Sequence, residues 1–320
     1  MKRRDLKFTS ARVFAPATVA NVGCGFDIFG FALHEPGDEL VLRVRAKKGV
    51  KITRIIGDKG LLPLQAEQNT AGQALLTMLD KLQADFGLEI ELYKKMPVGS
   101  GLGSSAASSV AAVFALNILL KEPLPARELL PFAIEGEKIA SGGVVHLDNV
   151  APGLYGGFVL VRHKASFDIV SIPTPPDLYC AVVHPHIEIM TAETRKMLKS
   201  RIPLQEAITQ WANVAGMVSA LTTGDFALLR RSLHDVVAEP DRAVLIPHYQ
   251  TIKRTALESG ASGFGISGSG PSVFAFCKGK RQALKTARAM RAVLDKTGIE
   301  NDVYISKINN EGAKVLAPLG

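Results

Sequence analysis

The stretch PVGSGLGSSAAS, residues 97–108, is the feature of the sequence that decides the fold. Three glycines alternate with other residues, and small residues follow them. Glycine has no Cβ and permits positive φ, so the N–H groups of such a loop can point inward together and form a nest for an anion. A helix expected to begin at Ser104 adds unpaired N–H groups and a partial positive charge. The stretch predicts a phosphate-binding loop; the alternative is a tight turn before an alanine-rich helix.

The spacing of the glycines excludes two common phosphate-binding motifs. A Walker A loop needs a lysine after its last glycine, and none is present. The dinucleotide-binding pattern GxGxxG fails because Ser104 stands where its last glycine would be. The hydroxyls of Ser104, Ser105 and Ser108 fall in the first turn of the expected helix, where one of them can reach a magnesium ion.

Hydrophobic periodicity on both sides of the loop predicts two α+β domains, 1–170 and 171–320, divided at a proline-rich segment that begins at Pro173. We expect the tail from residue 310 to be loosely held. Strands are predicted at 11–16, 38–46, 50–56, 88–96, 156–163, 178–185, 272–277 and 301–306. Helices are predicted at 69–87, 104–120, 125–140, 191–200, 203–222, 224–233, 247–258 and 280–296.

The composition is that of a globular protein with an excess of basic residues. The chain has 320 residues, 47% of them hydrophobic, and Lys+Arg exceed Asp+Glu by 38 to 30. The basic residues are dispersed and aromatic residues make up only 6%, so we expect no nucleic-acid partner. The uncharged stretch 99–120 is rich in Gly, Ser and Ala, which favours a buried helix over a membrane span.

Cysteine usage and the N-terminal segment indicate the compartment. Cys24, Cys180 and Cys277 are far apart and form no CxxC pair, so no disulfide framework is expected. The segment 1–16 is polar and has no apolar run of the kind found in signal peptides. We therefore expect a cytoplasmic protein with no membrane partner.

Three motifs in a fixed order connect the sequence to a known family. ARVFAPATVANVGCGFDIFGFAL (11–33), the glycine loop (97–108) and GASGFGISGSGPSVFAF (260–276) resemble the three signature motifs of the GHMP kinase superfamily, and the glycine loop resembles its ATP-binding motif. The resemblance implies an N-terminal domain like domain 2 of ribosomal protein S5 and a ferredoxin-like C-terminal domain. It also implies an active site between the two, which the third motif helps to close.

Further motifs narrow the resemblance to the branch of the superfamily that phosphorylates L-homoserine. These are NVGCGFD (21–27), HLDNVAPGLYGG (146–157), TAETR (191–195) and VVAEPDR (236–242). The implied reaction moves the γ-phosphoryl group of ATP to the side-chain hydroxyl of L-homoserine, a step of threonine biosynthesis, in a homodimeric enzyme. The alternatives are another small-alcohol kinase of the mevalonate type and a catalytically silent ATP-binding sensor.

The resemblance assigns residues to each part of the reaction. Asp27 would receive the substrate ammonium, and Arg242 the carboxylate, because a guanidinium offers a fork of donors. Asn149 and Arg195 would position the hydroxyl, and with Asp27 they form the catalytic set. Asn21, His146 and Thr191 would complete the substrate site. The ATP-binding residues would be Pro97, Val98, Gly99, Ser100, Gly101, Leu102, Gly103, Ser104, Ser105, Ala106, Ala107 and Ser108.

Magnesium needs hard oxygen ligands, and the resemblance implies one serine and one glutamate. Ser105 and Glu137 are the predicted ligands, with Glu135 as the rival to Glu137. Some members of the superfamily use an aspartate base with a lysine partner. Asn149 stands in the corresponding stretch and cannot act as a base at neutral pH. The resemblance therefore implies transfer without a strong side-chain base, with the alcohol losing its proton late.

Overall fold

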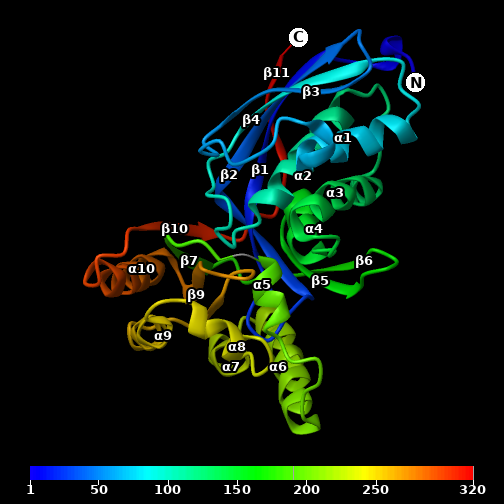
Figure 1. Cartoon of the computed structure of the whole chain (residues 1–320). Helices are drawn as coiled ribbons and strands as arrows, with labels where there is room; N and C mark the ends of the chain where they lie inside the picture. The colour runs from blue at the N-terminus through cyan, green and yellow to red at the C-terminus, as the bar shows by residue number, and fades with distance from the viewer. Residues whose placement is uncertain (190, 320) are drawn as a thin grey trace.

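The computed structural model describes residues 1–189 and 191–319, which form two sheets with helices packed against them (Figure 1). The larger sheet has seven strands in the order β11-β1-β2-β4-β3, and β5 pairs with β2 and with β6. Every pairing is antiparallel except that of β3 with β4. Its strands are β1 (Ser10–Ala20), β2 (Phe29–Arg45), β3 (Gly49–Ile56), β4 (Gly87–Tyr93), β5 (Phe158–His163), β6 (Asp168–Ile172) and β11 (Lys314–Leu319).

Helices α1 to α4 cover one face of this sheet (Figure 1). α1 begins after Asn69, whose side chain accepts hydrogen bonds from the N–H groups of Ala71 and Gly72 and so caps the helix. α2 is buried along most of its length, which explains its uncharged sequence. Among the described residues, no helix is both long and apolar enough to cross a membrane. The four helices are α1 (Thr70–Lys81), α2 (Ser104–Leu119), α3 (Ala126–Ser141) and α4 (Leu147–Tyr155).

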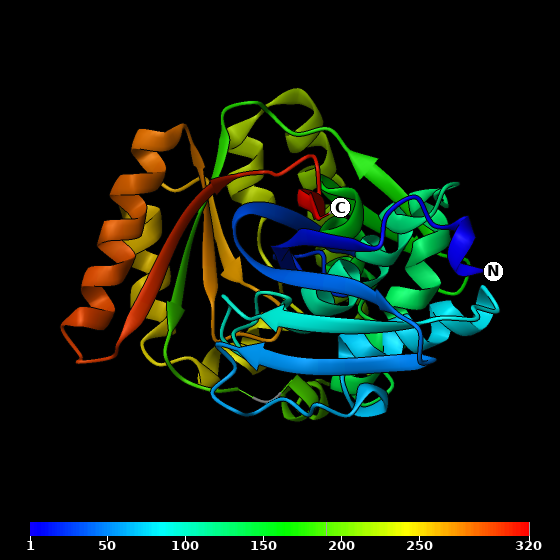
Figure 2. The same ribbon diagram turned by 90° about the horizontal axis from the view of Figure 1, so that it is seen from above.

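The smaller sheet has four antiparallel strands in the order β10-β7-β9-β8. Numbered within the second half of the chain, this is the order 4-1-3-2 of a ferredoxin-like sheet. Helices α9 and α10 lie on its outer face, as Figure 2 shows from above. The elements are β7 (Leu178–Pro185), β8 (Gly263–Ile266), β9 (Val273–Lys278), β10 (Asn301–Lys307), α9 (Tyr249–Glu258) and α10 (Lys280–Asp295).

The other face of the smaller sheet packs against the larger one. Successive residues of β9 alternate between two cores, because side chains in a strand alternate in direction. Phe274 and Phe276 join the core of the larger sheet, whereas Val273, Ala275 and Cys277 join the core under α9 and α10. Phe31 of β2 has its ring centroid 6.1 Å from that of Phe274 and 5.2 Å from that of Phe276. The two domains therefore share apolar contacts beside the expected site.

The remaining elements include four helices, α5 to α8, that lie between β7 and β8 in the chain. α6 and α7 pack against each other, and α8 is a single turn. The elements are α5 (Thr191–Lys196), α6 (Leu204–Thr223), α7 (Phe226–Ser232), α8 (Glu239–Arg242) and the 3-10 helices η1 (Arg3–Asp5), η2 (Ala66–Gln68) and η3 (Ala243–Leu245).

The expectation that the tail is loosely held is wrong. Residues 314–319 form β11, which pairs antiparallel with β1 from Ser10↔Leu319 to Phe14↔Lys314. The chain therefore returns from the second sheet to the first (Figure 1). This pairing involves residues about 300 positions apart, so no local pattern announces it. A division of the chain at residue 170 assigns β11 to the second domain, although β11 belongs to the larger sheet. The exact domain boundary stays a prediction.

Candidate active site

The glycine loop lies between β4 and α2 in the conformation that its sequence predicts. Gly99, Gly101 and Gly103 all have positive φ, of 72°, 74° and 66°. A Cβ on Gly103 would lie 2.1 Å from the Thr18 hydroxyl oxygen, so only glycine fits there. Within the described part of the chain, no N–H group from 99 to 103 donates a hydrogen bond. These groups and the start of α2 remain available to an anion.

The third motif packs directly on the glycine loop. The Ser267 hydroxyl donates to the Gly101 carbonyl at 2.7 Å, and the Ser272 hydroxyl donates to the Ser100 carbonyl at 2.6 Å. A Cβ on Gly101 would lie 2.6 Å from the Ser267 carbonyl oxygen. The smaller domain thus occupies the carbonyl side of the loop, which leaves the amide side for a ligand. The expected contribution of this motif to closing the site agrees with these contacts.

A buried histidine extends this contact into the smaller sheet. His184 is 3% exposed, and its Nδ1 lies 3.1 Å from the Ser272 hydroxyl. Because that hydroxyl donates to the Ser100 carbonyl, it accepts from His184, which places the proton on Nδ1. Burial and the charge of His186 lower the pKa of His184 to about 4. The imidazole is therefore neutral across the physiological range.

His184 should make the protein acid-sensitive between pH 6.5 and 4. In that interval the unfolded chain binds the proton and the folded chain does not, so the free energy of unfolding falls as the pH falls. A difference between an ordinary pKa of 6.5 and a folded value of about 4 corresponds to about 3 kcal/mol. We expect His184→Gln to flatten this part of a denaturant-unfolding profile against pH. His163→Gln, at an exposed position, should leave the profile as it is.

The predicted ammonium ligand, Asp27, lies in a cluster of charged groups. Its carboxylate accepts two hydrogen bonds from Arg195, at 3.2 and 2.7 Å, and forms an ion pair with Lys164 at 2.9 Å. Burial raises the pKa of the Asp27 carboxyl, but Arg195 and Lys164 outweigh burial and hold the pKa below its ordinary value. Asn21 accepts from the Asp27 N–H at 2.8 Å. Asp27 is therefore ionised and fixed in place.

Arg242 and Asn21 converge on the same backbone carbonyl. Both side chains donate to the Gly268 carbonyl, Arg242 Nη1 at 3.0 Å and Asn21 Nδ2 at 2.7 Å. Arg242 is 5% exposed, and its Nε has no hydrogen-bond partner in the described residues. Its guanidinium lies 4.9 Å from the centre of the Phe26 ring. A buried guanidinium with an unused donor is suited to bind a carboxylate.

The HLDN segment begins α4, a helix that the sequence analysis did not predict. Asn149 accepts a hydrogen bond from the Thr18 hydroxyl at 2.8 Å, so it lies beside Gly103. Asp148 is 1% exposed, and its Oδ1 has no hydrogen-bond partner among the described residues. Burial raises the pKa of the Asp148 carboxyl. The sequence analysis did not single out Thr18 or Asp148, although both stand in motifs that it quotes, 11–33 and 146–157.

The predicted magnesium ligands meet at the start of α2. Ser105 Oγ donates to Glu137 Oε1 at 3.0 Å, and His146 Nδ1 lies 3.5 Å from the same oxygen. Glu137 is 4% exposed, and its Oε2 is buried without a partner in the described residues. Such an oxygen fits a hard cation. Glu135 is 42% exposed at its side chain and pairs with Lys138, so the geometry favours Glu137.

Two further residues were predicted to contact ATP or the substrate, Ser108 and Thr191. Ser108 accepts a hydrogen bond from Lys94 at 2.7 Å and donates to the Ser104 carbonyl at 3.3 Å, so its hydroxyl points into the protein and not toward the loop amides. Thr191 is the first residue of α5, and its side chain lies outside the described part of the structure. Its predicted contact with the substrate stays a prediction.

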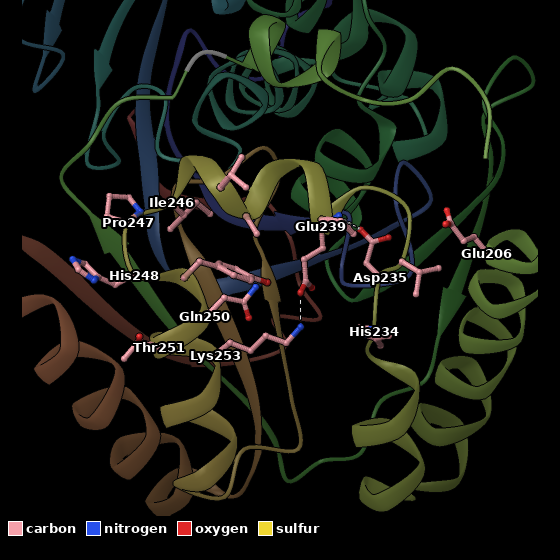
Figure 3. Close-up of a pocket in the computed structure, with 15 residues that line it drawn as sticks. Glu206, His234, Asp235, Glu239, Ile246, Pro247, His248, Gln250, Thr251 and Lys253 are labelled. Atoms are coloured by element: carbon pink, nitrogen blue, oxygen red, sulfur yellow. Dashed lines mark hydrogen bonds and ion pairs between the residues drawn. The ribbon is translucent and has the colours of Figure 1, made fainter. Parts of the chain in front are cut away.

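A separate open cavity of about 820 Å³ lies behind α8 (Figure 3). Glu239 and Lys253 form an ion pair inside it, as Figure 3 shows. Asp235 and Glu239 line both this cavity and a small cleft that Asn21, Arg242 and Gly268 also line. Of the predicted substrate residues, Asn21 and Arg242 line the small cleft. The larger cavity lies against the turn that carries Arg242 and holds none of the predicted residues.

Together these features define a kinase of the GHMP type: a lysine-free glycine loop at a helix start, closed by a Gly-Ser-Gly turn from a ferredoxin-like domain. Family models described as "GHMP kinases N terminal domain" and "GHMP kinases C terminal" match residues 69–157 and 217–296.

Individual relatives identify the branch. A homoserine kinase from Chlorobium phaeobacteroides (strain BS1) is 45% identical over 315 residues, which are 95% of this chain and 98% of the relative. The crystal structure of a homoserine kinase from Cytophaga hutchinsonii superposes with a TM-score of 0.94 at 51% identity and covers 97% of this chain and 98% of that one. An L. major mevalonate kinase, at 20% identity and a TM-score of 0.72 over 95% of this chain and 98% of that one, shares the fold. The chain belongs to the homoserine kinase family.

Proposed function

We propose that this protein transfers the γ-phosphoryl group of ATP to the side-chain hydroxyl of L-homoserine, giving O-phospho-L-homoserine for threonine biosynthesis. The observation that carries the proposal is the pairing of two half-sites. Free loop amides at 99–103 suit the phosphates of ATP, and the cluster around Asp27 and Arg242 suits an amino acid. The 45% identity to a homoserine kinase over nearly the whole chain supports the same substrate.

Each polar group of the substrate has a matching partner in the proposed site. The ammonium group meets the ionised carboxylate of Asp27, and the substrate carboxylate meets the buried guanidinium of Arg242. Asn149 and Arg195 position the hydroxyl, and Asn21, His146 and Thr191 complete the pocket. The hydroxyl oxygen forms a bond to the γ-phosphorus as the bond to ADP breaks, and the hydroxyl proton passes late in the step to an oxygen of the transferred phosphoryl group. Catalysis then rests on positioning and charge neutralisation.

The decisive experiment measures ADP release from the purified protein with ATP and magnesium. L-Homoserine, L-threonine, mevalonate and galactose are offered as separate acceptors. We expect turnover with L-homoserine to exceed that with each of the others. Preference for mevalonate would favour the mevalonate-type alternative. Nucleotide binding without turnover of any acceptor would favour the silent sensor.

Magnesium is the proposed metal, held by the Ser105 hydroxyl and the Glu137 carboxylate. When bound, it would neutralise phosphate charge during transfer. The Oε2 of Glu137, which is buried and has no hydrogen-bond partner in the described part of the chain, supports this assignment. Among the described residues there is no group of three or more His, Cys, Asp or Glu side chains that could hold a metal by themselves. Few protein ligands are typical of magnesium that is bound largely through phosphates and water.

Glu137→Gln should therefore raise the magnesium concentration needed for half-maximal activity. We expect an increase of about tenfold or more, because a ligand carboxylate is lost while the shape is kept. The measurement is initial rate against free magnesium at saturating ATP. Glu135→Gln is the matched control, two positions away on the same helix, and should leave the curve unchanged. The reverse result would assign the metal to Glu135.

A homodimer and a cytoplasmic location complete the proposal. Leu204, Ile208 and Trp211 lie on one side of α6 at helical spacing and are 70%, 39% and 57% exposed. Such a stripe is suited to a second copy of the chain. We expect light scattering to report a dimer and Trp211→Glu to shift it toward monomer. A monomeric wild-type protein would overturn the proposed dimer.

The proposed location is the cytoplasm. The three cysteines are buried and form no disulfide, which suits a reducing compartment.

A further inference from the structure

A buried ion pair lies directly beneath the glycine loop, at a place that no motif of the sequence marks. Lys94 follows β4, and Asp38 is in the middle of β2. The side chains of Lys94 and Asp38 are 2% and 1% exposed, and they form an ion pair. We propose that this pair is a positioning device, which holds the glycine loop in its phosphate-binding shape before the nucleotide arrives. The proposal rests on the proposed function of the loop.

The aspartate holds the segment that enters the loop. Asp38 Oδ1 accepts hydrogen bonds from the N–H groups of Lys95 and Met96, at 2.8 and 3.1 Å. Pro97 follows immediately and begins the glycine-loop motif. The path of the chain between β4 and Gly99 is therefore fixed by one carboxylate oxygen.

The lysine holds the helix that leaves the loop. Lys94 Nζ donates to the Ser104 carbonyl and to the Ser108 hydroxyl, both at 2.7 Å. With Asp38 as the third acceptor, all three N–H groups of the ammonium are used. The pair therefore joins both ends of the loop, residues 95–96 and the first turn of α2, through one buried contact.

The same contacts exclude a direct contact between Lys94 and phosphate. Its charge is neutralised by Asp38, and its three donors are already occupied inside the protein. Burying two charges is costly, and a buried pair often adds little net stability compared with apolar residues of similar shape. Its effect should therefore appear in the ATP site more than in the stability of the fold.

The test uses the double variant Asp38→Asn, Lys94→Met, which removes both charges and keeps the shapes. The new amide oxygen at position 38 can still accept from the two backbone N–H groups, whereas the thioether at position 94 cannot hold Ser104 or Ser108. We expect KM for ATP to rise at least about tenfold, because positioning errors of about an ångström have effects of this size or larger. KM for L-homoserine should change less than about twofold, because the substrate half of the site is left intact. Calorimetry with a non-hydrolysable ATP analogue should show the same loss of affinity.

The neighbouring pair Glu39 and Lys95 supplies a matched control. It joins the same two chain segments, but its lysine side chain is 55% exposed, and among the described residues neither side chain forms a hydrogen bond with α2. Glu39→Gln, Lys95→Met should keep the wild-type KM for ATP. An Asp38→Asn, Lys94→Met protein that is folded and binds the analogue normally would overturn the inference. An equal rise of KM for ATP and KM for L-homoserine would also overturn the inference, because it would indicate that the pair only stabilises the fold.

A third variant keeps the test decisive if the double variant does not fold. Ser108→Ala removes one acceptor of Lys94 without unpairing a charge, and we expect KM for ATP to rise about two- to threefold, the loss of one modest hydrogen bond. An unchanged value would overturn the inference. A wild-type protein that gives no heat with the analogue would overturn the proposed function and this inference together. Normal wild-type binding with unaffected variants would overturn this inference alone.

Discussion

Gly101→Ala is expected to abolish nearly all phosphoryl transfer. The residue has φ of 74°, a backbone conformation that costs an L side chain about 1–2 kcal/mol. The larger effect is steric. The new Cβ would lie 2.6 Å from the carbonyl oxygens of Ser267 and Gly270, which are backbone atoms and cannot rotate away. The loop and the third motif must separate, so the loop amides are displaced from the phosphates.

We expect kcat/KM to fall about 100-fold or more, because misplacement by about an ångström has this effect in a reaction that depends on positioning. Steady-state kinetics measure the loss, and thermal unfolding shows whether the fold survives. Gly142→Ala is the control, because Gly142 has φ of 63° but nothing within 4 Å of its Cβ position. It should lose about 1 kcal/mol of stability and keep its activity. Near-normal activity of Gly101→Ala would contradict the proposed role of the loop.

The glycine loop was predictable because its chemistry is local. Positive φ at three glycines, a helix start and serines in the first turn are all encoded within 97–108. The family resemblance predicted Ser105 and Glu137 as a pair of magnesium ligands. The structure favours Glu137 over Glu135, because Glu137 is buried and accepts from Ser105, whereas Glu135 is exposed and pairs with Lys138. Most of the longer helices and strands of the second half were predicted, because they have a clear period and a glycine or proline near one end. The short elements β8 and α8 were not predicted.

Features built from distant segments were not predictable. β11 pairs with β1 across almost the whole chain, and Lys164 reaches Asp27 from the turn after β5. A lone lysine in a turn resembles any solvated charge until the fold brings it to a carboxylate. Asp38 and Lys94 likewise look like ordinary charges in alternating strands. Helix α4 was missed because Pro152 and Gly153 within it are typical of loops.

The family resemblance assigned Arg195 to the substrate hydroxyl, but in the structure Arg195 binds Asp27. Arg195 can have both roles when the substrate ammonium binds the Asp27 carboxylate together with Arg195 and Lys164. A carboxylate has about four lone-pair sites, so it can accept from several donors. Asp27 then neutralises cationic groups from three sources, and its removal should affect the whole substrate half of the site.

Asp27→Asn should therefore cause the second large loss. Removing one partner of a partly buried charge cluster costs about 2–5 kcal/mol, which is about 30- to 4,000-fold in kcat/KM for L-homoserine. Most of the loss should appear in KM for L-homoserine, with KM for ATP little changed. Asp168→Asn breaks the exposed pair with Arg162 and should have no effect.

Acid titration provides an independent check on Asp27. Because its pKa is lowered in the folded protein, its stabilising contribution is present above the ordinary aspartate pKa and is lost as the pH falls through the lowered value. The difference in unfolding free energy between wild type and Asp27→Asn should therefore be constant from about pH 5 to 8 and shrink below about pH 4. A difference that stays constant or grows as the pH falls below about 4 would mean that Arg195 and Lys164 do not hold the carboxylate in its ionised form.

Comparison with Asn149→Ala separates binding from proton transfer. In a reaction without a side-chain base, Asp27→Asn weakens binding of L-homoserine, and Asn149→Ala lowers kcat by misplacing the hydroxyl. Direct binding of each substrate is measured by calorimetry, and turnover is measured at saturation. If Asp27→Asn binds both substrates normally but does not turn over, Asp27 takes the hydroxyl proton and the baseless mechanism is wrong. Because the lowered pKa makes Asp27 a weak base, we expect the loss to lie in binding.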